Sequence, residues 1–160
     1  MPSADVQYLL KYLAMARSRF VHGLDCVPDE RLNWSPGEGA KTPLQIADSC
    51  AGFFGFVGYA LKNGAMPESR EFPPASPDRE SAKQRLGDAF DALADVVRNL
   101  TDEDLQRTMP VPWRTEVPVE SFLYWVSSVA GYWQGQLNYL QTTYGDREPN
   151  VPKGWGTEEY

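Results

Sequence analysis

Histidine is the residue that this sequence most clearly lacks, because His22 is the only one among 160 residues. Imidazole is the commonest metal ligand in proteins and the side chain best suited to proton transfer near neutral pH. The two cysteines, Cys26 and Cys50, are too few for a disulfide framework. With no histidine near it in sequence to act as a base, Cys50 is interpreted as a buried residue of a helix interior rather than as a nucleophile.

Clusters of basic residues and long apolar runs are also missing. The chain has 15 Lys and Arg against 22 Asp and Glu, which gives a net charge of −7. Nucleic-acid binding requires clustered cations, so no nucleic-acid partner is expected. The longest apolar run, residues 50–61, is far short of the ~20 residues of a membrane span, and the first residues lack the pattern of a signal peptide. These absences predict a cytoplasmic protein without membrane association.

What the sequence does contain is four long segments with apolar residues at helical spacing. They cover residues 4–26, 42–62, 78–100 and 118–144. Thr42, Pro43 and Gln45 form the clearest helix start in the chain, a capping box with proline at the first helical position. Thr101–Asp104 predicts one extra short turn. The proline-punctuated segments 67–77 and 108–118 are predicted to be loops.

This pattern predicts an all-α protein, an antiparallel (up-down) four-helix bundle. With no repeat and no low-complexity tract, residues 1–146 are expected to form one domain, and residues 147–160 a C-terminal tail. Glycines at 52, 55 and 58 inside the second helix weaken it, so they indicate either close helix packing or space for a ligand, of which packing is preferred. Gly131 and Gly135 leave a similar smooth face on the last helix.

Four stretches, taken together, make a family resemblance recognisable. They occur in order and span about residues 5 to 146 of the chain: LLKYLAMARSRF, VPDERLNWSPGEGAKTPLQIADS, LTDEDLQR and GYWQGQLNYLQTTYGD. In these stretches the sequence resembles the DinB superfamily. The resemblance implies a DinB-like four-helix bundle, commonly a homodimer, with a divalent metal held between helices. It also implies, for members of known activity, a thiol-dependent transferase or isomerase in which the metal activates a low-molecular-weight thiol.

The metal ligands of the family are three histidines, one from the second helix and two from an H-x-x-x-H motif just before Gly135-Gln136. Carried over by the resemblance, these positions fall on Ser49, Val129 and Trp133. Val129 has no donor atom, Trp133 offers only an N–H, and a serine hydroxyl alone is a poor ligand for metals that favour nitrogen. The neighbours Asp48 and Cys50 point ~100° away from Ser49 on the helix. No metal and no other cofactor is therefore expected.

Two other features of the sequence are candidates for a binding site: the pair His22 and Cys26, and a stripe of residues on the last helix. His22 and Cys26 have ligand-compatible spacing, but two ligands make a weak metal site. Trp125, Val129, Trp133 and Gln136 fall on one stripe of the last helix, which Ser49 should face from the second helix. Trp133 either fills the space of the metal or lines a cleft in which Ser49, Gln136 and an indole N–H fix a small organic molecule. We expect the first.

The sequence therefore predicts a DinB-like protein that has lost the family metal site. Its expected role is to bind a small apolar ligand or to act as a homodimeric interaction module. The alternative is a thiol-dependent transferase or isomerase that uses bacillithiol, mycothiol or glutathione without the usual metal. Transfer chemistry needs a group that stabilises a thiolate, and the sequence supplies no obvious one. Whether the chain is an enzyme is therefore left open at this point.

Overall fold

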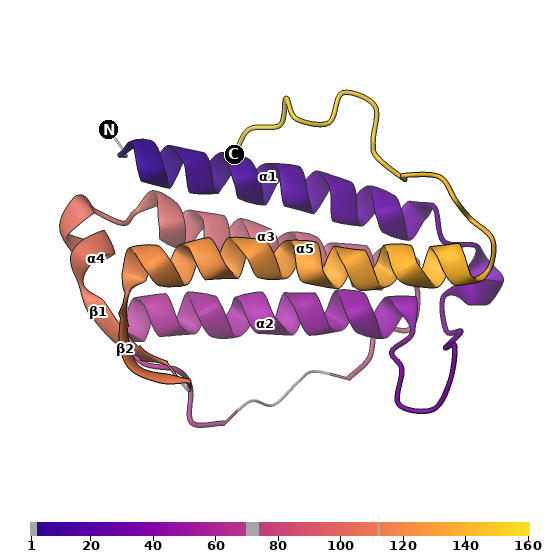
Figure 1. The fold of residues 1–160 in the computed structure, drawn as a ribbon, viewed down its shortest axis with the longest axis horizontal. Helices are drawn as coiled ribbons and strands as arrows, with labels where there is room; N and C mark the ends of the chain where they lie inside the picture. Colours follow the sequence, from indigo (N-terminus) through magenta and orange to yellow (C-terminus); the bar gives the residue numbers. More distant parts are fainter. Residues whose placement is uncertain (1–2, 70–73, 112) are drawn as a thin grey trace.

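Four long helices account for most of the chain (Figure 1). The computed structural model describes residues 3–69, 74–111 and 113–160. In these residues the elements, in chain order, are α1 (Ala4–Asp25), the 3-10 turn η1 (Asp29–Arg31), α2 (Pro43–Asn63), α3 (Arg79–Arg98), α4 (Asp102–Gln106), β1 (Thr108–Val111), β2 (Arg114–Pro118) and α5 (Val119–Thr143). The all-α four-helix bundle predicted from the sequence is confirmed.

Helix ends lie where local signals predict them. At the start of α2 the Gln45 N–H donates to Thr42 Oγ1 at 3.3 Å and the Thr42 N–H donates to Gln45 Oε1 at 3.0 Å. This reciprocal pair satisfies two backbone donors that a helix otherwise leaves free. Gly64 follows α2 with φ of 70°, a left-handed conformation that glycine adopts without strain. Thr101 and Asp104 form the same kind of box at α4, the predicted extra turn.

The helices run in two parallel pairs rather than in simple alternation. Near the start of both α2 and α3, Asp48 forms an ion pair with Arg85, and further along both helices Phe54 contacts Phe90. The helices α2 and α3 are therefore parallel. Tyr124 donates to Asp5 near the start of α5 and α1, and Gln141 donates to the Gly23 carbonyl near their ends. These two helices are parallel as well, and opposite to the first pair (Figure 1).

The direction of α3 thus differs from the up-down order expected from the sequence. The reason is the length of the connection that precedes it. A helix of 21 residues, such as α2, is about 32 Å long at 1.5 Å per residue. Fourteen residues, 65–78, separate Gly64 from α3 and span up to about 46 Å when extended. The chain can therefore return along the whole of α2 before α3 begins, and it does so.

A short hairpin forms where a loop was predicted. Strands β1 and β2 pair antiparallel, with Thr108 opposite Pro118 and Met109 opposite Val117, and the register is irregular between Met109 and Val111. Met109 and Val111 are buried, while Thr108 and Pro110 are exposed. Four residues are too few for this alternation to be distinguished from a loop, and two prolines argue against a strand.

The core lies between all four long helices. Its largest fully buried side chains come one from each helix: Phe20, Phe54, Phe90 and Phe122. By length and composition α2 is the one described helix that could cross a membrane. Half of its apolar window is buried in the bundle, as expected for a core helix, so this is weak evidence of a span.

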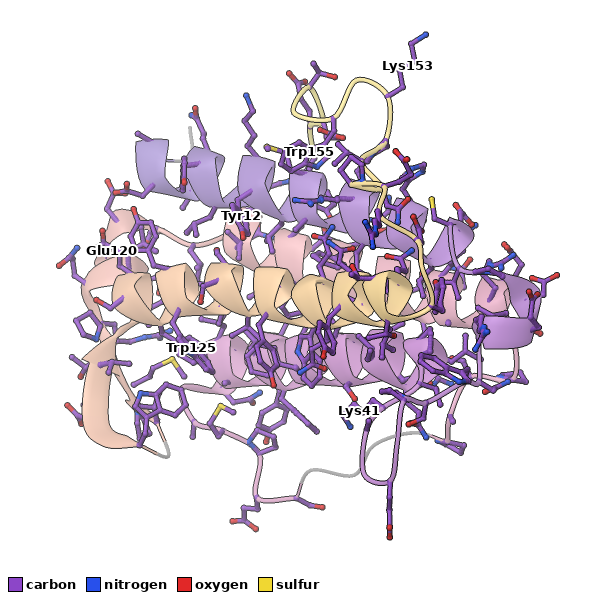
Figure 2. The ribbon with its side chains drawn as sticks, turned by 45° about the vertical axis from the view of Figure 1, so that its right-hand side comes forward. Tyr12, Lys41, Glu120, Trp125, Lys153 and Trp155 are labelled. Carbon is purple, nitrogen blue, oxygen red and sulfur yellow. The ribbon has the colours of Figure 1, made fainter. Side chains whose placement is uncertain are left out.

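The segment 147–160 lies along α1 (Figure 2). The Trp155 indole N–H donates to the Met15 carbonyl at 2.8 Å, and the Arg19 guanidinium stacks over the indole ring at 5.3 Å. Tyr160 packs against the edge of the core. What was expected to be a tail therefore covers part of the outer face of α1.

Candidate functional site

Packing of α2 against α5 places the three family ligand positions at one level of the bundle. Phe53 of α2 contacts Trp125 of α5 with ring centroids 5.4 Å apart, and Ile46 lines the same hollow as Trp133. On α2, Ser49 lies between Ile46 and Phe53 on one face, since residues three and four apart are neighbours on a helix. Val129 lies in the same way between Trp125 and Trp133 on α5. The antiparallel register therefore brings positions 49, 129 and 133 to the same height.

The side chains at these positions do not fit a metal. The Ser49 hydroxyl donates to the Gln45 carbonyl of its own helix at 2.7 Å. Val129 has no donor atom. The Trp133 Nε1 is buried without a hydrogen-bond partner among the described residues, and an indole N–H donates but does not ligate. No electron-pair donor set of the kind that zinc or iron requires is present at this level.

Neighbouring residues do not replace the missing ligands. The Asp48 carboxylate accepts hydrogen bonds from the Ser76 N–H and hydroxyl and forms an ion pair with Arg85, so its oxygens are engaged. The Cys50 thiol is fully buried, and burial raises its pKa far above the usual range, so the reactive thiolate is suppressed. Among the described residues, no three His, Cys, Asp or Glu side chains gather in a group that could hold a metal ion.

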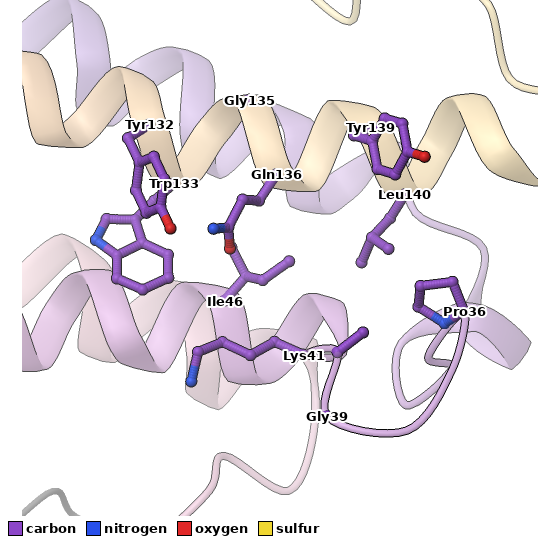
Figure 3. A pocket seen from close by; sticks show the side chains of 11 residues that line it. Pro36, Gly39, Lys41, Ile46, Tyr132, Trp133, Gly135, Gln136, Tyr139 and Leu140 are labelled. Atoms are coloured by element: carbon purple, nitrogen blue, oxygen red, sulfur yellow. The ribbon is translucent and has the colours of Figure 1, made fainter.

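A hollow of about 550 Å³ opens beside this level, between α5 and the loop before α2 (Figure 3). This volume falls in the range of pockets that bind small organic molecules. Most of the surface comes from aromatic and aliphatic side chains. The lining residues are Pro36, Gly39, Ala40, Lys41, Ile46, Tyr132, Trp133, Gly135, Gln136, Tyr139 and Leu140.

The loop that closes the hollow is held by its own side chains. The Ser35 hydroxyl lies 2.7 Å from the Gly37 carbonyl and 2.9 Å from the Ala40 carbonyl, so it can donate to either across the turn. Gly39 has φ of 79°, a left-handed conformation in which an L side chain would be strained. At the other end the loop enters the Thr42 cap of α2. The loop is therefore a defined structure, and it presents Lys41 to the hollow.

A small aromatic cluster anchors the start of this loop to the end of α5. The Trp34 ring packs edge-on against the Tyr144 ring with centroids 6.0 Å apart, and the Arg31 guanidinium lies over both rings. Burial, reinforced by the charge of Asp146, raises the pKa of Tyr144 to about 12. The phenol therefore stays neutral at physiological pH, and it packs as an uncharged aromatic ring.

The predicted site residues divide between the hollow and its surroundings. Trp133 and Gln136 line the hollow. Ser49 lines a second depression of about 520 Å³, which shares residues 39–41 with the first. Val129 is half-buried between the two helices. Trp125 (labelled in Figure 2) lies about two turns before Trp133, near the start of α5. There it belongs to a separate aromatic cluster, in which its ring centroid is 4.5 Å from that of Trp113 and its ring also contacts Phe53 and Phe122.

Trp133 itself has two roles. Its ring packs against the edge of the core, and it also lines the hollow. We expected this ring to fill the space of the metal. It does pack against the core, but an open volume remains next to it. Sequence reasoning did not identify Lys41, Tyr132 and Tyr139 as residues that line the hollow. A usable signal was the seven-residue spacing of the two tyrosines, which places both on one side of α5 around Gly135.

Gly55 and Gly58 of α2 do not serve the close packing that was preferred for them. A Cβ atom built at Gly55 or Gly58 would meet no atom within 4 Å, so that expectation is wrong at both positions. Gly135 on α5 is equally open, and there the open space is the hollow. Gly131 is closer to a neighbour, since a Cβ there would lie 3.8 Å from the Tyr12 hydroxyl.

His22 and Cys26 do approach each other, as their spacing suggested. The Cys26 Sγ lies 3.6 Å from His22 Nε2. Burial raises the pKa of the Cys26 thiol, and the nearby Asp146 and Asp25 carboxylates raise it further. A thiol held in its neutral form is a poor metal ligand.

Fold and site together define a four-helix bundle with a ligand-sized hollow between α5 and the loop before α2. Residues 12–128 match the DinB superfamily, and the chain belongs to that family. The match ends just before Val129, so Val129 and Trp133 lie beyond it. No curated protein matches the chain.

Two solved structures have the same fold. YfiT from Bacillus subtilis, described as a probable metal-dependent hydrolase with an unusual four-helix bundle topology, is 15% identical, with a TM-score of 0.75 over 91% of this chain and 91% of that chain. A DinB-like protein from Bacillus subtilis, YjoA, is 13% identical, with a TM-score of 0.73 over 91% of this chain and 96% of its own. At such identities the likeness concerns the fold alone.

Proposed function

We propose that this chain is a metal-free member of the DinB superfamily that binds a small, largely apolar molecule in the hollow between α5 and the loop before α2. The observation that carries this proposal is the combination of an open volume of about 550 Å³ with the side chains of Ser49, Val129 and Trp133 at the same level, which do not make a set of metal ligands. Apolar lining with a few polar groups is typical of small-molecule sites. The rings of Tyr132, Trp133 and Tyr139 and the side chains of Ile46 and Leu140 supply apolar contact, and Gln136 and Lys41 supply polar groups.

Gly135→Leu should abolish binding of a neutral apolar probe without harming the fold. A Cβ at this position meets no atom within 4 Å, so a leucine side chain extends into the hollow and occupies it. Replacing a helical glycine also stabilises a helix by about 0.5–1 kcal/mol. The probe is N-phenyl-1-naphthylamine, whose fluorescence rises on transfer from water to an apolar site. We expect saturable binding to the wild type and at least a tenfold higher Kd for Gly135→Leu.

Gly55→Leu provides the matched control for this experiment. It makes the same substitution in a helix, and a Cβ there also meets open space, but Gly55 lines no hollow described above. This variant should bind the probe as the wild type does. Circular dichroism melting curves should show that both variants remain folded. Equal probe binding by wild type and Gly135→Leu would disprove the hollow as the binding site.

A thiol-dependent transferase is the second candidate, favoured by one observation: Lys41 places an ammonium group at the hollow, where a thiolate could be held. The effect of this cation is small, because Lys41 is exposed and water screens its charge. A bound metal ion would stabilise a thiolate far more strongly. The Cys50 thiol is buried and does not line the hollow.

We therefore expect no turnover when the purified chain is incubated with bacillithiol, mycothiol or glutathione and a panel of electrophilic acceptors. Consumption of the thiol, followed by loss of free sulfhydryl groups, should equal the rate of the uncatalysed reaction. A rate enhancement that depends on the chain, and that disappears in Gly135→Leu, would instead establish the transferase and overturn the pure binding function.

A further inference from the structure

The charge of the hollow differs from that of the whole chain. The chain carries a net charge of −7, yet among the described residues that line the hollow Lys41 alone is charged and none is a carboxylate. Within the described residues, no carboxylate lies within 4 Å of the Lys41 ammonium, whereas six other cations have such partners: Arg17, Arg79, Lys83, Arg85, Arg98 and Arg107. Lys41 is thus a cation that the fold leaves available beside an apolar surface.

The aromatic side chains around the hollow leave a space for a flat group. Tyr132 and Tyr139 are 59% and 67% exposed, which is high for tyrosines, and they flank Gly135 on the same side of α5. Gly135 has no side chain to fill the gap between them. Trp133 lies edge-on to Tyr132, with ring centroids 5.1 Å apart. Aromatic rings in these relative positions favour stacked and edge-on contacts with another ring.

The polar groups approach the hollow from two sides (Figure 3). Gln136 projects from α5 toward α2, and Lys41 extends from the loop along α2 in the direction of Trp133. An anion gains a charge-assisted hydrogen bond from the ammonium, and such bonds are stronger than neutral ones. A cationic ligand would face repulsion from Lys41 and would find no compensating carboxylate in the part of the lining that the structure describes.

Resting on the proposed binding function, we infer that the ligand is a flat aromatic acid, whose ring lies among Tyr132, Trp133 and Tyr139 and whose anionic group pairs with the Lys41 ammonium. The ring supplies the apolar contact and the acid supplies orientation. The class includes aromatic carboxylates and sulfonates, because both present oxygen anions on a planar ring.

Two matched probes test this inference separately from the binding function. The first is the neutral N-phenyl-1-naphthylamine, and the second is 8-anilino-1-naphthalenesulfonate, the same ring system with one sulfonate added. We expect the wild type to bind the sulfonate about 3- to 10-fold more tightly than the neutral probe at low ionic strength. In Lys41→Gln this preference, measured as the ratio of the two Kd values, should disappear. Salt at 0.5 M should reduce the preference in the wild type, since salt screens exposed charges.

Lys62→Gln is the matched control, because it removes the same charge from an exposed lysine at the far end of α2. It should retain the full preference for the sulfonate, and Lys41→Arg should retain most of it. If the neutral probe binds in the hollow and the sulfonate binds no more tightly, or if Lys41→Gln keeps the preference, the inference is wrong while the binding function stands. If neither probe responds to Gly135→Leu, both are wrong.

Discussion

Replacing Asp48 with alanine should lower the free energy of unfolding by about 3–5 kcal/mol, the range typical of breaking a buried ion pair. The Asp48 side chain is only 12% exposed, and its oxygens accept from the Ser76 N–H at 2.7 Å, the Ser76 hydroxyl at 2.6 Å and Arg85 Nη1 at 2.8 Å. Alanine removes all three interactions at once. It also leaves the Ser76 amide and hydroxyl buried without an acceptor, which adds to the loss.

Urea unfolding followed by circular dichroism measures this loss. Asp95→Ala is the matched control, because Asp95 also pairs with an arginine, Arg98, but is 71% exposed, so its loss should cost less than about 1 kcal/mol. Asp48→Asn keeps one oxygen acceptor and should lie between the two. A cost below about 1 kcal/mol for Asp48→Ala would show that the carboxylate does not stabilise the fold.

The same carboxylate connects three segments that are far apart in sequence. It lies on α2, accepts from Ser76 just before α3, and pairs with Arg85 on α3. These contacts hold the start of α3 beside the start of α2, so they stabilise the parallel arrangement of the two helices. From sequence, Asp48 was considered only as a neighbour of a ligand position. Its structural role depends on where the chain goes after α2, which no local pattern specifies.

Local signals explain why the helices themselves could be predicted. The Thr42–Gln45 box, the Gly64 C-cap and the Thr101–Asp104 turn each depend on residues three or four positions apart, and all of them occur in the structure. The direction of α3 and the β1–β2 hairpin were not predicted. Both depend on contacts between distant residues or on strands too short to show a period.

In the candidate site, too, residues on a helix could be anticipated from the sequence, whereas a residue on a loop could not. The shared stripe on one helix made Trp133 and Gln136 candidates for a pocket wall, with Trp133 preferred as a ring that fills the space, and both residues line the hollow. Lys41 belongs to a loop, whose path depends on the Ser35 turn and the left-handed Gly39, so its side chain could not be placed from sequence. Trp125 shares the stripe but lies about two turns before Trp133, near the start of α5, and does not line the hollow. Trp113, which lies between the strands of the unpredicted hairpin, packs against it.

Restoring the three histidines should create a metal site where the chain has none. In Ser49→His, Val129→His, Trp133→His, the register of α2 and α5 brings three imidazoles to one level of the bundle. Three protein nitrogens with a water as fourth ligand form a common tetrahedral zinc site. We expect one zinc per chain after dialysis, and a rise in unfolding free energy of about 2.7 kcal/mol when free zinc is 100 times its Kd. Elemental analysis and zinc-dependent melting curves measure both.

The wild type and the single variant Trp133→His are the controls, and neither should retain zinc, nickel or iron in stoichiometric amount. Trp133→His loses the apolar contacts of the indole, so it should also be less stable than the wild type. A folded triple variant that takes up no metal would show that positions 49, 129 and 133 are not the family ligand positions. Stoichiometric metal in the wild type would show that this chain holds its metal with other residues, and the hollow beside Trp133 would then lie next to a working metal site.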